Sequence, residues 1–275
     1  VREEQRDGRG RDPALTAAHG MILILGGKGF VGSAFARWCE RGGREFRVVT
    51  RADYASHVGT SCDVLINAAG NSSKPLAAER PLADFEASVL AVRRSLEDFR
   101  PGLYVHISSC DVYPDCSSPA ATAEDAPLPP ARQSAYGFHK RLAELCVMNR
   151  APRWLVLRAG GFVGPGLRKN AVFDILNGGP LWLDPSSELQ YLSTDAAAAL
   201  AMTLVEKAAV NEVFNLCGDG TVRLEDIARR AGRKPGARPG SPVKRYDVSL
   251  RKLKEAVPVP RSEDEVFRFV DAWKG

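Results

Sequence analysis

The stretch Ile22-Leu23-Ile24-Leu25-Gly26-Gly27-Lys28-Gly29-Phe30-Val31-Gly32 decides the fold of this chain. Its four apolar residues indicate a buried strand, and the segment that follows the last glycine, Ser33 to Arg41, indicates a helix. The glycine spacing matches a dinucleotide-binding fingerprint in two registers, starting at Gly26 or at Gly27. An ordinary tight turn can also need glycines, but a position between a first strand and a first helix favours the fingerprint.

Glycines suit this loop because the turn is tight and the backbone must approach a pyrophosphate closely. The following helix start offers free N–H groups and a partial positive charge to the phosphates. The sequence therefore predicts a cofactor-binding loop composed of Gly26, Gly27, Lys28, Gly29, Phe30, Val31 and Gly32.

Further apolar runs alternate with helical patterns along the chain. Strands are expected at Ile22 to Leu25, Phe46 to Thr50, Val64 to Asn67, Leu103 to Ser108, Trp154 to Arg158 and Val213 to Leu216. One helix face is expected from Phe85, Val89, Val92, Leu96 and Phe99. This alternation predicts an α/β fold of the Rossmann type, with a doubly wound parallel sheet and a small C-terminal substrate lobe.

Three segments are expected within the 275 residues. Residues 1–20 are polar and charged, which predicts a disordered leader. Residues 21–160 are expected to form the NAD(P)-binding domain. Residues 161–275, rich in loop-forming Pro and Gly at first, are expected to form the substrate lobe, interleaved with the last strands.

Composition narrows the class of protein. The formal net charge of +5 is modest, and the basic stretch from Arg229 to Lys254 contains no aromatic residue before Tyr246, so a solvated surface is favoured over a nucleic-acid site. The six cysteines show no metal-ligand spacing, so no metal is expected. The apolar run Met21 to Leu25 is too short for a signal or membrane segment, which predicts a cytoplasmic protein with no membrane partner.

The end of the second strand bears on the choice of cofactor. An acidic residue there would bind the ribose hydroxyls of NAD, but the strand ends in Thr50-Arg51. Arg51 could hold the 2′-phosphate of NADP, and Lys28 could add a second cation. NADP is therefore expected first, while Asp53 keeps NAD as the alternative.

Tyr136 and Lys140 are four residues apart in a predicted helix, Ser134 to Arg150, and so share one face. A nearby ammonium stabilises a phenolate, which predicts that Tyr136 shuttles a proton while a nicotinamide exchanges hydride. Such a pair also occurs on surface helices by chance. Support comes from Ser109, which follows the fourth strand at the edge where open α/β sheets bind ligands.

Five ordered segments resemble the extended short-chain dehydrogenase/reductase family, also called the NAD-dependent epimerase/dehydratase family. They are the glycine loop, Asn67-Ala68-Ala69-Gly70, Ser108-Ser109-Cys110-Asp111-Val112-Tyr113, Tyr136 with Lys140, and Leu157 to Gly166. The resemblance covers nearly all of Met21 to Trp273. It implies an enzyme with Ser109, Tyr136 and Lys140 as catalytic residues, with Lys140 also on the nicotinamide ribose, and with Ala68, Ala69 and Gly70 beside the adenosine half of the cofactor.

The chain departs from the family pattern in its expected substrate contacts. Gly161 replaces an asparagine and Glu188 replaces an arginine that hold the substrate diphosphate in the family. Lys244 resembles a late basic substrate contact, and Asp111 stands where sugar dehydratases of the family carry a glutamate base. A structural partner role for Asp111 is an equal alternative. Only about a dozen residues separate the second strand from Val64, which predicts a smaller sheet.

These observations lead to one expected function and two alternatives. The first is an NADP-dependent ketoreductase or epimerase acting on a sugar, most readily a nucleotide sugar, with Ser109, Asp111, Gly161 and Lys244 on the substrate side. The alternatives are a sugar-nucleotide dehydratase and a dinucleotide-binding regulator without turnover. The assembly state is left open, with a homodimer as one expectation.

Overall fold

The computed structural model describes residues 20–234 and 236–273, so all of the predicted leader except Gly20 lies outside the described residues. At the centre is a six-stranded parallel sheet with the order β2-β1-β3-β4-β5-β9. Its strands are β1 (Ile22–Leu25), β2 (Phe46–Val49), β3 (Ser61–Asn67), β4 (Arg100–Ser109), β5 (Trp154–Ala159) and β9 (Glu212–Leu216). All six predicted strands are confirmed, and with them the Rossmann-type fold.

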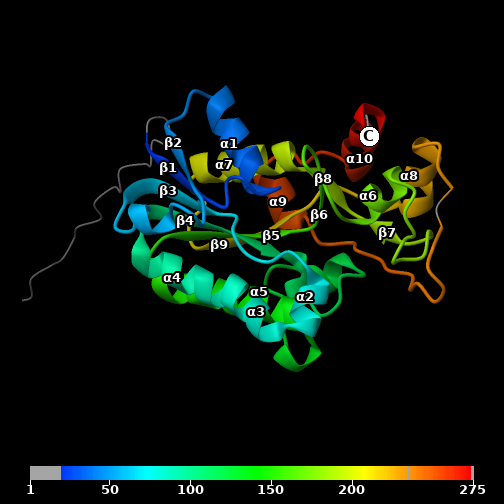
Figure 1. The fold of residues 1–275 in the computed structure, drawn as a ribbon, viewed down its shortest axis with the longest axis horizontal. Helices are drawn as coiled ribbons and strands as arrows, with labels where there is room; N and C mark the ends of the chain where they lie inside the picture. The colour runs from blue at the N-terminus through cyan, green and yellow to red at the C-terminus, as the bar shows by residue number, and fades with distance from the viewer. Residues whose placement is uncertain (1–19, 235, 274–275) are drawn as a thin grey trace, which may run out of the picture.

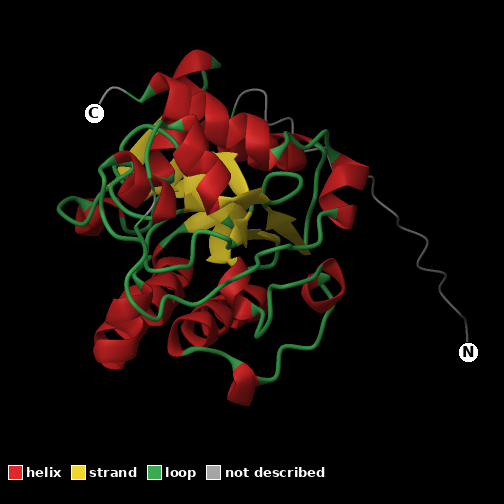
Figure 2. Ribbon diagram, turned by 90° about the vertical axis from the view of Figure 1, so that its right-hand side faces the viewer, coloured by secondary structure: helices red, strands yellow, loops and turns green. Residues whose placement is uncertain are grey.

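Helices cover both faces of this sheet, which forms the central layer in Figure 2. One face is covered by α1 (Gly32–Arg41) and α7 (Thr194–Glu206), and the other by α4 (Ala91–Asp98) and α5 (Ala135–Arg150) (Figure 1). Strand side chains alternate between the two resulting cores, because successive residues of a strand point to opposite faces.

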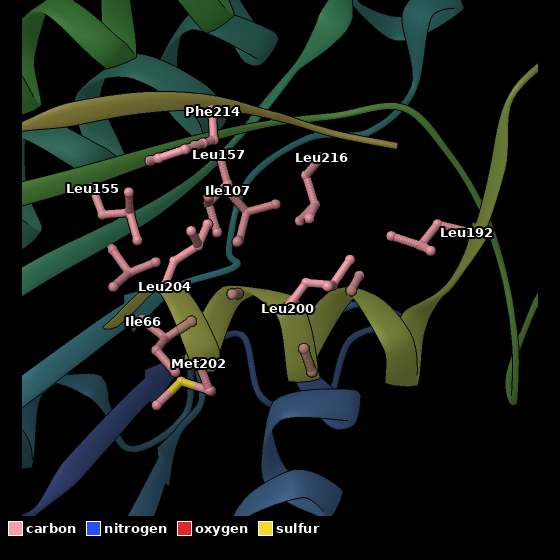
Figure 3. Close-up of a cluster of buried hydrophobic side chains, with 14 of the residues drawn as sticks. Ile66, Ile107, Leu155, Leu157, Leu192, Leu200, Met202, Leu204, Phe214 and Leu216 are labelled. Atoms are coloured by element: carbon pink, nitrogen blue, oxygen red, sulfur yellow. The ribbon is translucent and has the colours of Figure 1, made fainter. Parts of the chain in front are cut away.

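The core beneath α7 is shown in Figure 3. Strand residues such as Ile66, Ile107 and Leu155 face Leu200 and Leu204 of the helix. All five are at most 8% exposed, and full burial of such a side chain contributes about 1.5–3 kcal/mol to folding. No helix among the described residues is both long and apolar enough to cross a bilayer.

The chain order places a topological switch point between β1 and β3. From β1 the chain moves to β2 on one side, and then to β3 on the other. Residues 50–60 hold only the short 3-10 helix η1 (Tyr54–His57), so β2 is the edge strand of a six-stranded sheet. Ligands of open α/β sheets bind at the carboxyl ends of the strands beside such a point.

The segment from Phe85 to Phe99 differs from the single helix face that its periodicity predicts. It consists of the end of α3 (Pro81–Phe85), the π-helix η2 (Glu86–Leu90) and α4. A π-turn holds more residues than an α-turn and therefore changes the phase of the side chains. As a result Phe85 is 38% exposed, whereas Val92 and Leu96 are buried as expected.

A buried ion pair joins α5 to the sheet. Arg158 on β5 donates to both carboxylate oxygens of Glu144, at 3.1 and 3.0 Å, and neither residue is more than 1% exposed. Ser108 on β4 donates to the same carboxylate at 2.6 Å. These bonds offset the large cost of burying both charges and fix α5 over the ends of β4 and β5.

The chain after β5 builds a smaller lobe beside the sheet, while α7 and β9 return to it (Figure 1). We call the short strands and helices outside the sheet layers the C-terminal lobe. Its elements are β6 (Gly161–Val163), α6 (Ala171–Leu176), β7 (Glu188–Leu189), β8 (Tyr191–Ser193), β10 (Val222–Arg223), α8 (Leu224–Arg230) and α10 (Ser262–Ala272), and α9 (Arg251–Ala256) packs beside β9.

Candidate active site

The glycine loop between β1 and α1 can accept no side chain at two of its positions. Gly26 has φ of +76°, and a Cβ on Gly32 would lie 2.2 Å from the carbonyl oxygen of Gly26. Helix α1 begins with Val31 as its N-cap, which makes no side-chain capping bond. The N–H groups of Ser33 and Ala34 donate to the backbone carbonyls of Gly29 and Val31, at 3.0 and 3.1 Å, and no side chain caps the start of α1.

A second loop meets the first at the switch point. A Cβ on Gly26 would lie 2.9 Å from the backbone nitrogen of Ala69, so the two chains are in close contact. Asn67 holds the second loop, since its side chain accepts from the Ala69 N–H at 3.0 Å and donates to Tyr104 at 2.7 Å. The predicted cofactor residues Ala68, Ala69 and Gly70 are thus brought beside the glycine loop, and the arrangement fits a dinucleotide.

The end of β2 carries an exposed arginine and an engaged carboxylate. Asp53 accepts from the backbone N–H and the hydroxyl of Thr50, at 2.6 and 2.9 Å. The backbone bond first, and then the hydroxyl bond, lower the pKa of Asp53. Arg51 and Lys28 are exposed at this edge. The Asp53 carboxylate, which was the reason to keep NAD as the alternative cofactor, therefore stabilises the turn after β2.

The structure brings together Ser109, Tyr136 and Lys140. Ser109 is the last residue of β4, while Tyr136 and Lys140 lie in the first turns of α5, whose N-cap Ser134 accepts from the Gly137 N–H at 3.1 Å. A Cβ on Gly137 would lie 2.0 Å from the carbonyl oxygen of Asp111, so only glycine lets α5 approach the end of β4 this closely. All three predicted catalytic residues are 7 or 8% exposed.

The acidity of the phenol differs from the sequence-based expectation. Burial first, and then the charge of Asp111, raise the pKa of Tyr136, while Lys74 and a hydrogen bond with Ser109 lower it. The ammonium of Lys140 lies 5.6 Å from the centre of the Tyr136 ring. In the protein without cofactor, burial therefore opposes the effect that the sequence predicts for this ammonium, and the acidity of the phenol beside a bound nicotinamide stays a prediction.

Lys140 is itself almost fully buried, near several carboxylates. Burial lowers the pKa of Lys140 to about 8, against the opposing effects of Asp84, Asp111 and Glu144. Its ammonium lies 3.6 Å from the position that a Cβ on Gly70 would take. Lys140 therefore lies between Tyr136 and the loop that contains Gly70.

Asp111 lies in a polar cluster that sequence reasoning did not find. One of its oxygens accepts from Lys74 at 2.7 Å and from Tyr246 at 2.9 Å, and the other accepts from the Ser109 hydroxyl at 3.2 Å. Lys74 begins α2 (Lys74–Glu79), and Tyr246 comes from the C-terminal part of the chain. Local sequence could not reveal this contact, because Lys74 and Tyr246 are 172 residues apart. The one sequence feature that pointed to Lys74 was its position four residues after Gly70.

The predicted substrate residues of the lobe lie where they offer a substrate fewer contacts than the sequence predicts. A Cβ on Gly161 would lie 2.6 Å from the carbonyl oxygen of Gln190, so this glycine is required for packing and offers the substrate no side chain. Glu188 pairs with Arg245 at 2.9 Å and Arg223 at 3.8 Å. Lys244 is exposed, and its backbone N–H donates to Ser187 at 3.0 Å.

Comparison with solved structures gives the same architecture. A UDP-galactose 4-epimerase matches with a TM-score of 0.76 at 24% identity, over 92% of this chain and 100% of the other. UDP-glucuronic acid 4-epimerase from Bacillus cereus, in complex with UDP-glucuronic acid and NAD, matches with 0.73 at 16% identity, over 91% and 99%. UDP-N-acetylglucosamine 4-epimerase from Methanobrevibacter ruminantium M1, in complex with UDP-N-acetylmuramic acid, matches with 0.75 at 15% identity, over 92% and 97%.

No curated protein matches the chain. The model of one protein family does, over residues 22–217, which span the sheet from its first strand to just past β9. The match includes both cofactor loops, Ser109, Tyr136, Lys140 and the pair of strands β6 and β8 that begins the lobe. The chain belongs to the NAD dependent epimerase/dehydratase family.

Proposed function

We propose that this protein is an NAD(P)-dependent oxidoreductase that acts at a secondary alcohol or ketone of a sugar, as a ketoreductase or an epimerase. One observation carries the proposal. Three buried side chains, Ser109, Tyr136 and Lys140, meet at the carboxyl edge of the sheet, directly beside the two loops that suit a dinucleotide. A phenol, a hydroxyl and an ammonium are the groups that proton transfer at a carbonyl requires.

Each side chain has a distinct role in this proposal. Tyr136 gives its proton to the substrate oxygen during reduction and takes it back during oxidation. Ser109 donates a hydrogen bond to the same oxygen, for which its hydroxyl turns away from Asp111. Lys140 binds the cofactor ribose beside Gly70. When bound, the nicotinamide exchanges hydride with the substrate carbon, and its oxidised ring adds a positive charge near the phenol.

We favour a nucleotide sugar as substrate. The solved structures with the same fold include enzymes named for UDP-galactose, UDP-glucuronic acid and UDP-N-acetylglucosamine. The opposing observation is that Gly161 and Glu188 replace the diphosphate contacts expected of the family. We assign contact with the substrate diphosphate instead to Lys244 and to the two arginines that pair with Glu188.

NADP is favoured over NAD as the cofactor. The support is local: Arg51 and Lys28 are exposed at the edge of the cofactor loop, and Asp53 is engaged by Thr50. A carboxylate held in this way is a poor partner for ribose hydroxyls, whereas an arginine at this position suits a 2′-phosphate.

The contacts of Asp111 argue against the dehydratase alternative. A catalytic base needs an open carboxylate, but Asp111 accepts hydrogen bonds from Lys74, Tyr246 and Ser109. We assign it a structural role, in which it links the end of β4 to α2 and the C-terminal segment. The regulator alternative predicts cofactor binding without turnover.

The test is to mix the protein with NADPH and a panel of keto-sugar nucleotides and to follow absorbance at the nicotinamide wavelength. Epimerase activity is followed in parallel by chromatography of UDP-sugars. Tyr136→Phe should lose about 10²- to 10⁴-fold in kcat, because the proton donor is removed while the ring and its packing remain. Binding of NADPH without turnover on any substrate would favour the regulator instead.

We further propose that the protein is a homodimer that associates through the outer surface of α5 and η2. A shallow groove of about 350 Å³ lies there and is lined by Phe85, Val89, Leu142 and Leu145. Leu145 is 44% and Leu90 is 42% exposed. Sedimentation should give twice the chain mass of 29.8 kDa, and a single-chain mass would contradict the proposal.

A further inference from the structure

Asp84, at the end of α3, has a fully buried carboxylate that no part of the proposed mechanism uses. One oxygen accepts from Asn71 at 2.8 Å and from Ser88 at 2.9 Å. The other lies 2.7 Å from Nδ1 of His139, which is 9% exposed. A charge in such a buried position acts more strongly on nearby groups than a charge at the surface does.

The three partners of Asp84 come from the segments that surround the Lys140 ammonium. Asn71 follows Gly70, where a Cβ would lie 3.6 Å both from the Lys140 ammonium and from the carbonyl oxygen of Ala87. Ser88 follows Ala87 in the π-helix η2, and His139 precedes Lys140 in α5. The carboxylate thus ties together the cofactor loop, η2 and α5 around one ammonium group.

Asp84 also differs from the other carboxylates that face Lys140. Glu144 is paired with Arg158 and Arg141, at 3.0 and 2.8 Å, and Asp111 is paired with Lys74. No lysine or arginine of the described residues lies within 4.0 Å of the Asp84 carboxylate. The ring that does lie within this distance of the carboxylate is the imidazole of His139, whose Nδ1 is 2.7 Å away.

The remaining groups near Lys140 carry no charge at neutral pH. His106 lies on β4 beneath α5, where burial, and then the charge of Lys140, lower the pKa of His106 to about 3. Tyr136 is a neutral phenol, since burial raises its pKa. Lys140 is 7% exposed, so water reaches it little, and Asp84 is the carboxylate near it that has no lysine or arginine partner among the described residues.

We propose that the Asp84–His139 pair is a positioning device for Lys140, in which the buried carboxylate keeps the ammonium protonated and holds it beside Gly70. The geometry of this pair is independent of the substrate, but its effect on turnover rests on the proposed function. Because a lysine loses its charge as the pH rises through its pKa, removal of the Asp84 charge moves the loss of the cation to lower pH.

The test is Asp84→Asn in the full chain, grown with lysine labelled with ¹³C at Cε. The Lys140 signal, assigned by its absence in Lys140→Arg, is titrated by NMR. We expect a midpoint near 8 in the wild type and a fall of about one pH unit or more in Asp84→Asn. Glu86→Gln, an exposed carboxylate two residues away, is the matched control and should leave the midpoint unchanged.

Two outcomes of this experiment would contradict the proposal. If Asp84→Asn folds, as shown by circular dichroism, and the Lys140 midpoint stays within about 0.3 units of the wild type, the proposal is wrong. If that variant does not fold, the wild-type titration decides, because a Lys140 midpoint below about pH 7 would show that the pair does not keep it protonated.

The NMR titration needs no substrate, so it is readable even if the enzyme shows no turnover. Where turnover is found, the alkaline limb of the kcat/KM profile should move to lower pH in Asp84→Asn by the same amount. His139→Gln, which keeps an N–H donor for the carboxylate, should leave that limb within a few tenths of a unit of its wild-type position.

Discussion

The cofactor half of the molecule and the C-terminal lobe form their sites in different ways. In the cofactor half, the site depends on backbone geometry, since Gly26 and Gly32 leave no space for side chains and α1 presents an N-terminus without a side-chain cap. In the lobe, the comparable positions depend on side-chain charges, and these charges are already paired, as Glu188 is with Arg245. The proposed cofactor site is thus closely packed, while the proposed substrate contacts of the lobe are exposed ion pairs, which contribute little free energy.

The largest effect should come from closing the space in the glycine loop. Gly32→Ala places a methyl group 2.2 Å from the Gly26 carbonyl oxygen, so the loop must move away from the phosphates. We expect cofactor affinity to fall at least about a hundredfold in calorimetry, because close backbone approach is what the loop provides. Gly42→Ala, at the other end of α1, is the control and should bind normally, since its Cβ would meet nothing closer than 3.4 Å. Normal binding by Gly32→Ala would remove the loop from the cofactor site.

A smaller effect is expected at the edge of the same half. Arg51→Ala should weaken NADP binding about 10- to 100-fold and leave NAD binding unchanged, because only the 2′-phosphate is lost as a partner. Arg47→Ala, which removes another exposed arginine from β2, serves as the control for a general loss of positive charge. Equal effects of Arg51→Ala on both cofactors in calorimetry would contradict the preference for NADP.

The smallest effect should come from the lobe, because its ion pairs are exposed and each contributes little free energy. Glu188→Gln removes the charge that pairs Arg245 and Arg223, which are 49% and 54% exposed. If these arginines face a diphosphate, UDP affinity should rise a few-fold, in keeping with the small energies of exposed pairs. Asp226→Asn, which frees Arg229 in α8, should not change it. An unchanged UDP affinity in Glu188→Gln would mean that the diphosphate binds elsewhere.

Much of the fold followed from local patterns. The six strands were recognised because each is a short apolar run bounded by polar or turn residues. The helix from Phe85 to Phe99 was predicted only in part. A π-turn is set by packing, here around Ser88 and the carboxylate of Asp84, and it leaves no signature in residue spacing.

The sequence by itself determined the parallel sheet, the glycine loop and the three catalytic candidates, because these depend on residue types at short and fixed spacings. Only the tertiary structure decided which charges surround them. Lys74 reaches Asp111 and Tyr246 from distant segments, and Asp84 reaches His139 across 55 residues. Burial raises the pKa of Tyr136, since the hydration of a side chain depends on everything that packs against it and not on its neighbours in the chain.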